Sequence, residues 1–116
     1  MIKGELATYS IEFSLRIISY YKWLTEVKRE YVVARQILRS GTSIGANIHE
    51  AEYAISKADF INKIQIAAKE ANETEFWLII LEQSGFFDES YNDLKPLLKS
   101  LIRMLTATLK TSKNGK

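Results

Sequence analysis

The sequence predicts an all-α protein with the architecture of an antiparallel up-down four-helix bundle. Apolar residues recur at steps of three and four along nearly the whole chain, which is the spacing of one face of an α-helix. No segment shows the alternating pattern of a strand. The 116 residues suffice for one domain, and contents of 47% hydrophobic and 26% charged residues are ordinary for a globular protein. Short connections between long helices favour antiparallel neighbours.

Four helices are expected in a single domain, residues 1–116, and each has its own apolar stripe. The expected helices cover residues 5–25, 29–55, 57–84 and 88–112, followed by a basic tail at 113–116. The expected core stripes, in chain order, are Leu6, Phe13, Ile17, Tyr20 and Leu24; Val33, Ile37, Ile44, Ile48, Ala51 and Ile55; Phe60, Ile64, Ala67, Ala71, Thr74, Leu78 and Leu81; and Leu94, Leu98, Leu101, Leu105 and Thr108, widened by Leu97, Ile102 and Leu109.

The expected boundaries have recognisable local chemistry. Ser56 and Asp59 form a capping-box pattern at the start of the third helix. Gly85 suits a left-handed C-cap at its end. If the fourth helix begins at Asp88, Pro96 lies about two turns inside it and should bend it.

The segment RSGTSIGANIHEA, residues 39–51, is predicted to be helix interior despite its two glycines. Ile37, Ile44 and Ile48 keep the helical phase across Gly41 and Gly45. No lysine follows the second glycine and no strand precedes the segment, so a phosphate-binding loop is excluded. Glycine in a helix costs about 1 kcal/mol relative to alanine. We therefore expect a close helix–helix approach at these positions, and the alternative, a kink at Gly41 or Gly45, is compatible with it.

A polar ridge lies beside the apolar stripe of the second helix. Its residues follow steps of three and four and are Arg35, Arg39, Ser43, Asn47 and Glu50. Such a row can form a hydrogen-bonded strip that satisfies neighbouring groups inside the fold or an interface. The alternative is a ligand-binding ridge.

Apolar side chains surround the third helix near its end. The run of six residues from 76 to 81 covers nearly two turns, whereas a bundle core can cover only one broad stripe. Leu78 and Leu81 have the phase of the core. The remaining side chains are expected to form an oligomer interface, unless a wide core absorbs them, and they are Phe76, Trp77, Ile79 and Ile80.

The charges are distributed unevenly along the chain. Residues 58–93 contain eight acids and two lysines, whereas residues 94–116 contain six cations and no acid. Lys95, Lys99, Arg103 and Lys110 share one side of the fourth helix, so they predict contacts to phosphates of structured RNA or DNA without base readout. This row lacks an aromatic stacking platform, which argues against a single-strand specialist. The alternatives are a plain solvated face and an adaptor surface for a partner protein.

Catalysis is not expected from this sequence. His49 and Glu50 are adjacent, which places them about a hundred degrees apart on a helix rather than as an acid–base pair. Glu70, Glu73 and Glu82 lack the Glu-x-x-His pattern of di-iron bundles. We therefore predict no enzyme activity and no catalytic residue.

The composition also argues against metal, cofactor and membrane binding. The chain has no cysteine and a single histidine, so a zinc site is not expected, and no cofactor motif is recognised. The longest apolar run is too short to cross a bilayer, and the N-terminal residues do not have the pattern of a signal peptide. A cytoplasmic location without a membrane partner is expected.

Two segments carry a resemblance to a known family. "LRSGTSIGANIHEA" followed by "ADFINKIQIAAKEANETEFWL" resembles the four-helix-bundle family of 23S rRNA intervening-sequence proteins, over residues 6–112. That family shows a Ser-Ile/Val, two residues, Asn-Ile, one residue, Glu core and a helix of the type "KEA…ET..WL". The matching residues are Arg39, Ser43, Asn47, Glu50, Glu70, Glu73, Trp77 and Leu78. Many members have proline where this chain has Gly45.

The resemblance implies a four-helix bundle that assembles into a ring-shaped homopentamer and has no established enzymatic activity. Members are encoded inside insertions in bacterial ribosomal RNA genes or elsewhere in genomes. A related branch, the accessory variability determinant of diversity-generating retroelements, works with a reverse transcriptase and binds nucleic acid. The resemblance therefore implies a homo-oligomer with RNA, DNA or a protein as its partner.

Overall fold

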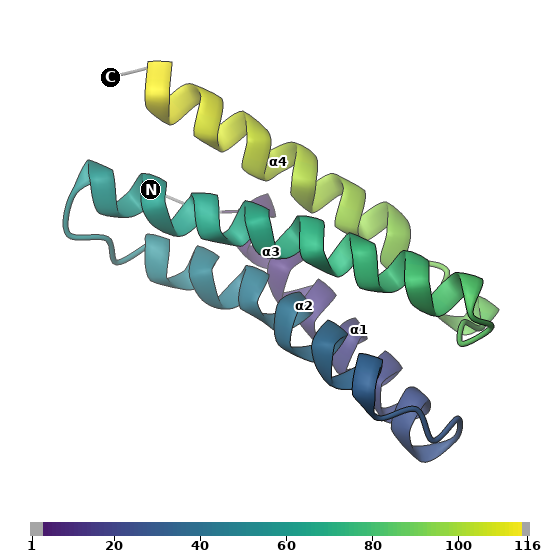
Figure 1. The fold of residues 1–116 in the computed structure, drawn as a ribbon. Coiled ribbons are helices and arrows are strands. Elements are labelled where there is room, and N and C mark those ends of the chain that lie inside the picture. The colour runs from purple at the N-terminus through teal and green to yellow at the C-terminus, as the bar shows by residue number, and fades with distance from the viewer. Residues whose placement is uncertain (1–3, 115–116) are drawn as a thin grey trace.

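The computed structural model describes residues 4–114 and confirms an all-α four-helix bundle (Figure 1). The helices are α1 (Glu5–Glu26), α2 (Val32–Ala51), α3 (Lys57–Gln83) and α4 (Leu94–Asn114), with a short 3₁₀ helix η1 (Glu89–Tyr91) before α4. The molecule measures 48 × 21 × 21 Å. α1 packs against α2 and α4, and α3 packs against the same two helices, so α1 and α3 lie diagonally across the bundle.

The apolar stripes form the core almost as expected. All five stripe residues of α1 are buried, and so are most of those in the other three helices. Val33, Phe60 and Thr108 lie at the edge of the core and are half-buried. Ile55 is the exception, since 92% of it is exposed. It keeps the helical phase in the sequence, but α2 ends at Ala51 and leaves Ile55 in the α2–α3 loop.

The two glycines of α2 lie inside an unbroken helix that approaches α1 closely. A Cβ built on Gly41 would lie 3.0 Å from the Ile17 Cγ1 atom. A Cβ on Gly45 would lie 3.1 Å from the Ser14 Oγ and 3.4 Å from the Ser10 carbonyl oxygen. The missing side chains therefore allow α1 to pack closer than alanine would permit, which confirms the close-approach interpretation.

Both predicted caps of α3 are present. The Ser56 hydroxyl accepts the Asp59 N–H at 3.0 Å, and the Asp59 carboxylate accepts the Ile55 N–H at 3.2 Å. At the other end Gly85 has φ +87°. The Phe86 N–H donates to the Leu81 carbonyl at 2.8 Å and the Gly85 N–H to the Glu82 carbonyl at 3.2 Å, the two bonds of a Schellman motif.

Helix α4 begins at Leu94, six residues later than the expected start at Asp88. The Asp88 carboxylate instead accepts the Ser90 N–H at 2.9 Å and caps η1. The Tyr91 ring lies 5.0 Å from the buried Tyr20 ring, which holds this segment out of the helix. Pro96 is therefore in the first turn of α4, where proline fits, and the expected bend two turns into the helix is wrong.

The loop between α1 and α2 contains a strained residue and an unexpected cap. α2 begins at Val32 rather than at residue 29, and the Glu30 carboxylate accepts the N–H groups of Val33 and Ala34 at 3.2 and 2.7 Å. Arg29 has φ +58° and is the one non-glycine residue with positive φ in the described chain. The left-handed region costs an L-residue on the order of 1–2 kcal/mol.

Replacing Arg29 with glycine should therefore stabilise the protein by about 1 kcal/mol, measured as a higher midpoint of urea unfolding at an unchanged slope. Lys28→Gly is the matched control, because Lys28 has negative φ and lies over the Trp23 ring at 5.7 Å. That variant should lose stability. A lower midpoint for Arg29→Gly would show that the arginine side chain contributes more than the backbone strain removes.

Candidate functional site

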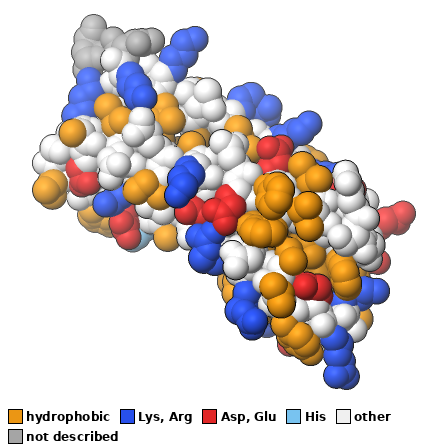
Figure 2. Space-filling model, in the orientation of Figure 1, with side chains coloured by type: hydrophobic (Ala, Val, Ile, Leu, Met, Phe, Trp, Pro, Cys, Tyr) orange, Lys and Arg blue, Asp and Glu red, His pale blue; other side chains and the backbone are white. Residues whose placement is uncertain are grey.

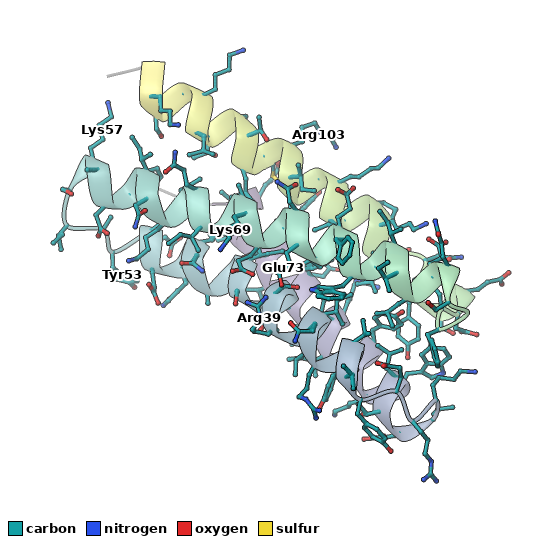
Figure 3. All side chains as sticks on the ribbon, in the orientation of Figure 1. Arg39, Tyr53, Lys57, Lys69, Glu73 and Arg103 are labelled. Carbon is teal, nitrogen blue, oxygen red and sulfur yellow. The ribbon has the colours of Figure 1, made fainter. Side chains whose placement is uncertain are left out.

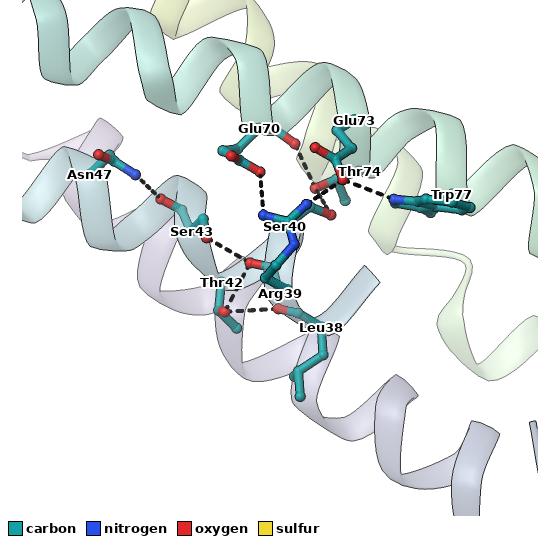
Figure 4. Close-up of polar contacts among 10 residues, drawn as sticks. All are labelled: Leu38, Arg39, Ser40, Thr42, Ser43, Asn47, Glu70, Glu73, Thr74 and Trp77. Carbon is teal, nitrogen blue, oxygen red and sulfur yellow. Dashed lines mark hydrogen bonds and ion pairs between the residues drawn. The ribbon is translucent and has the colours of Figure 1, made fainter. Parts of the chain in front are cut away.

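A polar cluster joins α2 to α3 through Arg39 (Figure 4). The Arg39 guanidinium contacts the Glu70 carboxylate through Nη1 at 3.2 Å and the Glu73 carboxylate through Nη2. The Trp77 indole N–H donates to the same Glu73 oxygen at 3.2 Å. One arginine thus bridges two acids that lie one turn apart on α3.

The electrostatics of this cluster favour the charged forms. The hydrogen bond from Trp77, followed by the hydrogen bond from Arg39, lowers the pKa of the Glu73 carboxyl group below its ordinary value. The hydrogen bond with Glu73 raises the pKa of the Arg39 guanidinium. Glu70 is only 8% exposed, so Arg39 neutralises a carboxylate that the bundle has largely removed from water.

A buried hydroxyl pair lies directly beneath the arginine. The Thr74 Oγ1 atom lies 2.8 Å from the Ser40 Oγ atom and 2.8 Å from the Glu70 carbonyl oxygen. Both residues are fully buried. Thr74 was expected in the core stripe, but its pairing with Ser40 was not, because that pairing depends on the relative rotation of two helices.

The other residues of the polar ridge bind mainly to their own helix. The Ser43 hydroxyl donates to the Arg39 carbonyl at 2.7 Å, and the Asn47 amide donates to the Ser43 carbonyl at 2.9 Å. Glu50 is exposed, and its carboxylate lies 3.6 Å from the Lys63 ammonium group on α3. Arg35 is exposed and has no ion pair within residues 4–114.

The ridge is therefore not one continuous strip within the protomer. Asn47 and Glu50 do not bond to each other in the described chain. The reason is that each side chain reaches a nearer partner, the Ser43 carbonyl or Lys63. The structural or interface role of the ridge stays a prediction, supported at Arg39 by its two acids.

The expected interface residues form an apolar patch on α3. Phe76 is 52% exposed, Ile79 and Ile80 are also exposed, and Trp77 is half-buried with its ring 4.9 Å from that of Phe76. Figure 2 shows hydrophobic side chains gathered on this part of the surface, beside acidic side chains. The core absorbs only part of the apolar run, so this surface remains available to a partner.

A second exposed apolar stripe lies on α1 and was not predicted. Ile11, Leu15 and Ile18 follow steps of four and three, and all three are exposed. Their phase places them on the side of α1 opposite to its core stripe. The sequence signal was this second periodicity, which the buried stripe of Phe13 and Ile17 obscured.

The cations of α4 do not all have the same surroundings. Lys99, Arg103 and Lys110 are exposed, and Figure 3 labels Arg103 midway along α4. Lys95 instead forms an ion pair with Glu82 of α3. The expected row of four cations is therefore a row of three with one lysine held against α3.

The α1–α2 loop combines exposed cations with an exposed aromatic ring. Within the described chain this loop end has exposed Val27, Tyr31 and Val32 beside exposed Lys28, Arg29 and Arg35. The lower end of Figure 2, where the α1–α2 loop of Figure 1 lies, shows Lys and Arg side chains interspersed with hydrophobic ones. This combination was not predicted, because the prediction concerned only the α4 cations, which lack an aromatic platform.

Metal and membrane sites find no support in the described residues. No group of three or more His, Cys, Asp or Glu residues between 4 and 114 is arranged to hold a metal ion. No described helix combines the length and apolar character needed to cross a membrane.

The protein is a small all-α bundle in which Arg39 of α2 pairs with Glu70 and Glu73 of α3. Apolar and basic surfaces remain exposed. The family model of the 23S rRNA-intervening sequence protein matches residues 5–107, so the chain belongs to this family. A similar solved structure is that of a protein of unknown function from the S23 ribosomal protein family of Bacteroides thetaiotaomicron. It has a TM-score of 0.89 and 46% identity over 92% of this chain and 100% of that chain. A comparison with curated proteins gives no match.

Replacing Arg39 with methionine should destabilise the protein by about 1–2 kcal/mol, because the nearly buried Glu70 carboxylate loses its partner while the exposed half of Arg39 limits the loss. Urea unfolding measures the change. Arg35→Met is the matched control and should stay within about 0.5 kcal/mol of the parent. Adding Glu70→Gln to Arg39→Met should recover part of the lost stability, because the unpaired charge is then removed. Equal unfolding midpoints for Arg39→Met and Arg35→Met would contradict a stabilising role for the Arg39 ion pairs.

Proposed function

We propose that the protein is a non-enzymatic, cytoplasmic homo-oligomer that binds structured RNA or DNA through the basic side of α4, without reading bases. The observation that carries the proposal is the row of exposed Lys99, Arg103 and Lys110 on a helix whose sequence contains no acid. Phosphate contacts from such a row supply affinity that does not depend on sequence. Repetition of the row around an assembly, a pentamer as the family resemblance implies, would multiply its charge.

An adaptor that holds a partner protein is the second candidate. The exposed apolar patch at Phe76, Ile79 and Ile80 favours it, because phosphate binding has no use for such a surface. In the first proposal the same patch is the contact between copies of this chain. The two candidates therefore differ in what covers the patch and in whether the α4 cations bind phosphate.

The double variant Lys99→Glu/Arg103→Glu should bind nucleic acid more weakly and with a smaller salt dependence. Each lost phosphate contact lowers the slope of log affinity against log salt by about 0.9 for a duplex. Fluorescence anisotropy with two unrelated duplexes should show a similar loss for both. Lys57→Glu/Lys69→Glu on α3 is the control, since it changes the net charge equally and both lysines are exposed away from α4 and the α1–α2 loop. A parent protein that binds no duplex at low salt would favour the adaptor.

Light scattering at micromolar concentration should give a mass several times the 13.3 kDa of one chain. Phe76→Glu should shift the assembly towards the single-chain mass, because it places a charge in the proposed interface. Ile55→Glu is the matched control, an equally apolar residue exposed in a loop. A monomeric parent, or an assembly unaffected by Phe76→Glu, would remove the α3 patch as the contact.

A further inference from the structure

We propose that the α1–α2 loop end is a second nucleic-acid contact, which takes an unpaired nucleotide on Tyr31 and the phosphates beside it on Arg29 and Arg35. This inference rests on the proposed function, since it concerns the same class of partner. It differs in the surface used and in the form of nucleic acid bound. We call residues 27–35 the loop tip.

The loop tip offers the two components that an unpaired strand requires. Tyr31 is 46% exposed at the N-terminal boundary of α2, so part of its ring is free to stack on a base. Arg35 follows one helical turn later and is exposed, and Arg29 precedes Tyr31 by two residues and is also exposed. Two cations thus flank the ring along the chain, as a base and its neighbouring phosphates require.

Two of the acids near the loop tip are occupied by hydrogen bonds. The Glu30 carboxylate accepts two N–H groups of α2, which fixes it against the helix start. Asp88 of the neighbouring loop has a pKa lowered mainly by its hydrogen bonds to Ser90 and further by Lys28. Lys28 itself lies over the Trp23 ring at 5.7 Å. Glu26 and, next to Asp88, Glu89 are further exposed acids at this end, and within residues 4–114 neither forms an ion pair with Arg29 or Arg35, whose charge stays available.

The opposite loop provides a contrast within the same molecule. The α2–α3 loop also exposes an aromatic and an aliphatic residue, Tyr53 and Ile55, and Figure 3 labels Tyr53 and Lys57 at that end. Its surroundings contain three acids, Glu50, Glu52 and Asp59, against Lys57 and the Lys63 that pairs with Glu50 and Asp59, so acids outnumber lysines there. The charge at the α1–α2 tip is therefore what selects an anionic partner, and the exposed ring selects one with a flat apolar face.

The backbone of Arg29 adds an independent observation. Its φ of +58° is a conformation that glycine adopts without strain. The fold uses this turn, since the Glu30 N–H donates to the Leu24 carbonyl at 2.9 Å across it, but glycine would serve the turn equally. An arginine at a strained position is therefore an observation that favours a use for its side chain. The same feature allows a test in which stability and binding change in opposite directions.

The experiment measures anisotropy of a labelled twenty-nucleotide oligouridylate and of an RNA duplex of equal length. Tyr31→Ala should weaken oligouridylate binding about five- to hundredfold, as expected for one lost base stack, and should change duplex binding less than twofold. Tyr31→Phe keeps the ring and should bind like the parent. Arg29→Gly should lower the salt slope for oligouridylate by about 0.7 while raising the unfolding midpoint, so misfolding cannot explain the loss.

Several results would overturn the proposal. Tyr31→Ala that binds oligouridylate like the parent removes the stacking contact, and polyglutamate that competes as well as unlabelled oligouridylate indicates an acidic protein partner. A parent that binds the duplex but not oligouridylate refutes the loop tip and leaves the α4 proposal standing. A parent that binds neither refutes both.

Discussion

Three consecutive residues of α2 fix the positions of both neighbouring helices. Arg39 binds the two acids of α3, Ser40 contacts Thr74 of α3, and Gly41 allows Ile17 of α1 to approach. Each contact tolerates little displacement. Moving α2 would separate Arg39 from its acids, leave the buried Ser40 hydroxyl without a partner, and open a gap between Gly41 and Ile17. A shift of α2 by one residue would break all three. The rotation and height of α1 and α3 relative to α2 follow from this single turn.

The sequence predicted what depends on periodicity and missed what depends on relative helix rotation. The stripes containing Phe13, Ile44 and Leu101 were predicted because each repeats with the helical period, which is visible within a single helix of the sequence. The resemblance named Arg39 and Glu73, but no single-helix pattern shows that they meet. Ile55 and the start of α4 were misplaced because apolar phase continues past the residues where capping groups end a helix. Asp88 caps a 3₁₀ turn there, and this local hydrogen bond outweighs the pattern.

The exposed apolar residues form two separate surfaces on diagonal helices. Phe76 and Ile80 lie on α3, whereas Ile11 and Leu15 lie on the far side of α1 from its core stripe. Neither surface is needed to close the bundle, since the core is complete without them. A contact that pairs like surfaces through a two-fold axis would cover one surface and leave the other in water. Exposed apolar area on both α1 and α3 therefore favours contacts between unlike surfaces, or two different partners.

The α1–α2 and α3–α4 loops, at one end of the bundle, each contain one residue with positive φ, but the residue types differ. The chain leaves α3 through Gly85 at φ +87° and leaves α1 through Arg29 at φ +58°. Glycine at Gly85 needs no further explanation, because it adopts this conformation without strain and completes the Schellman bonds. Arginine in the same region raises the free energy of the folded state, and its exposed side chain forms no ion pair within the described residues to offset that. The turn at Arg29 also serves the fold, since the Glu30 N–H donates to the Leu24 carbonyl at 2.9 Å, but glycine would make this turn without strain. The proposed phosphate contact gives the arginine side chain a use that the fold itself does not supply.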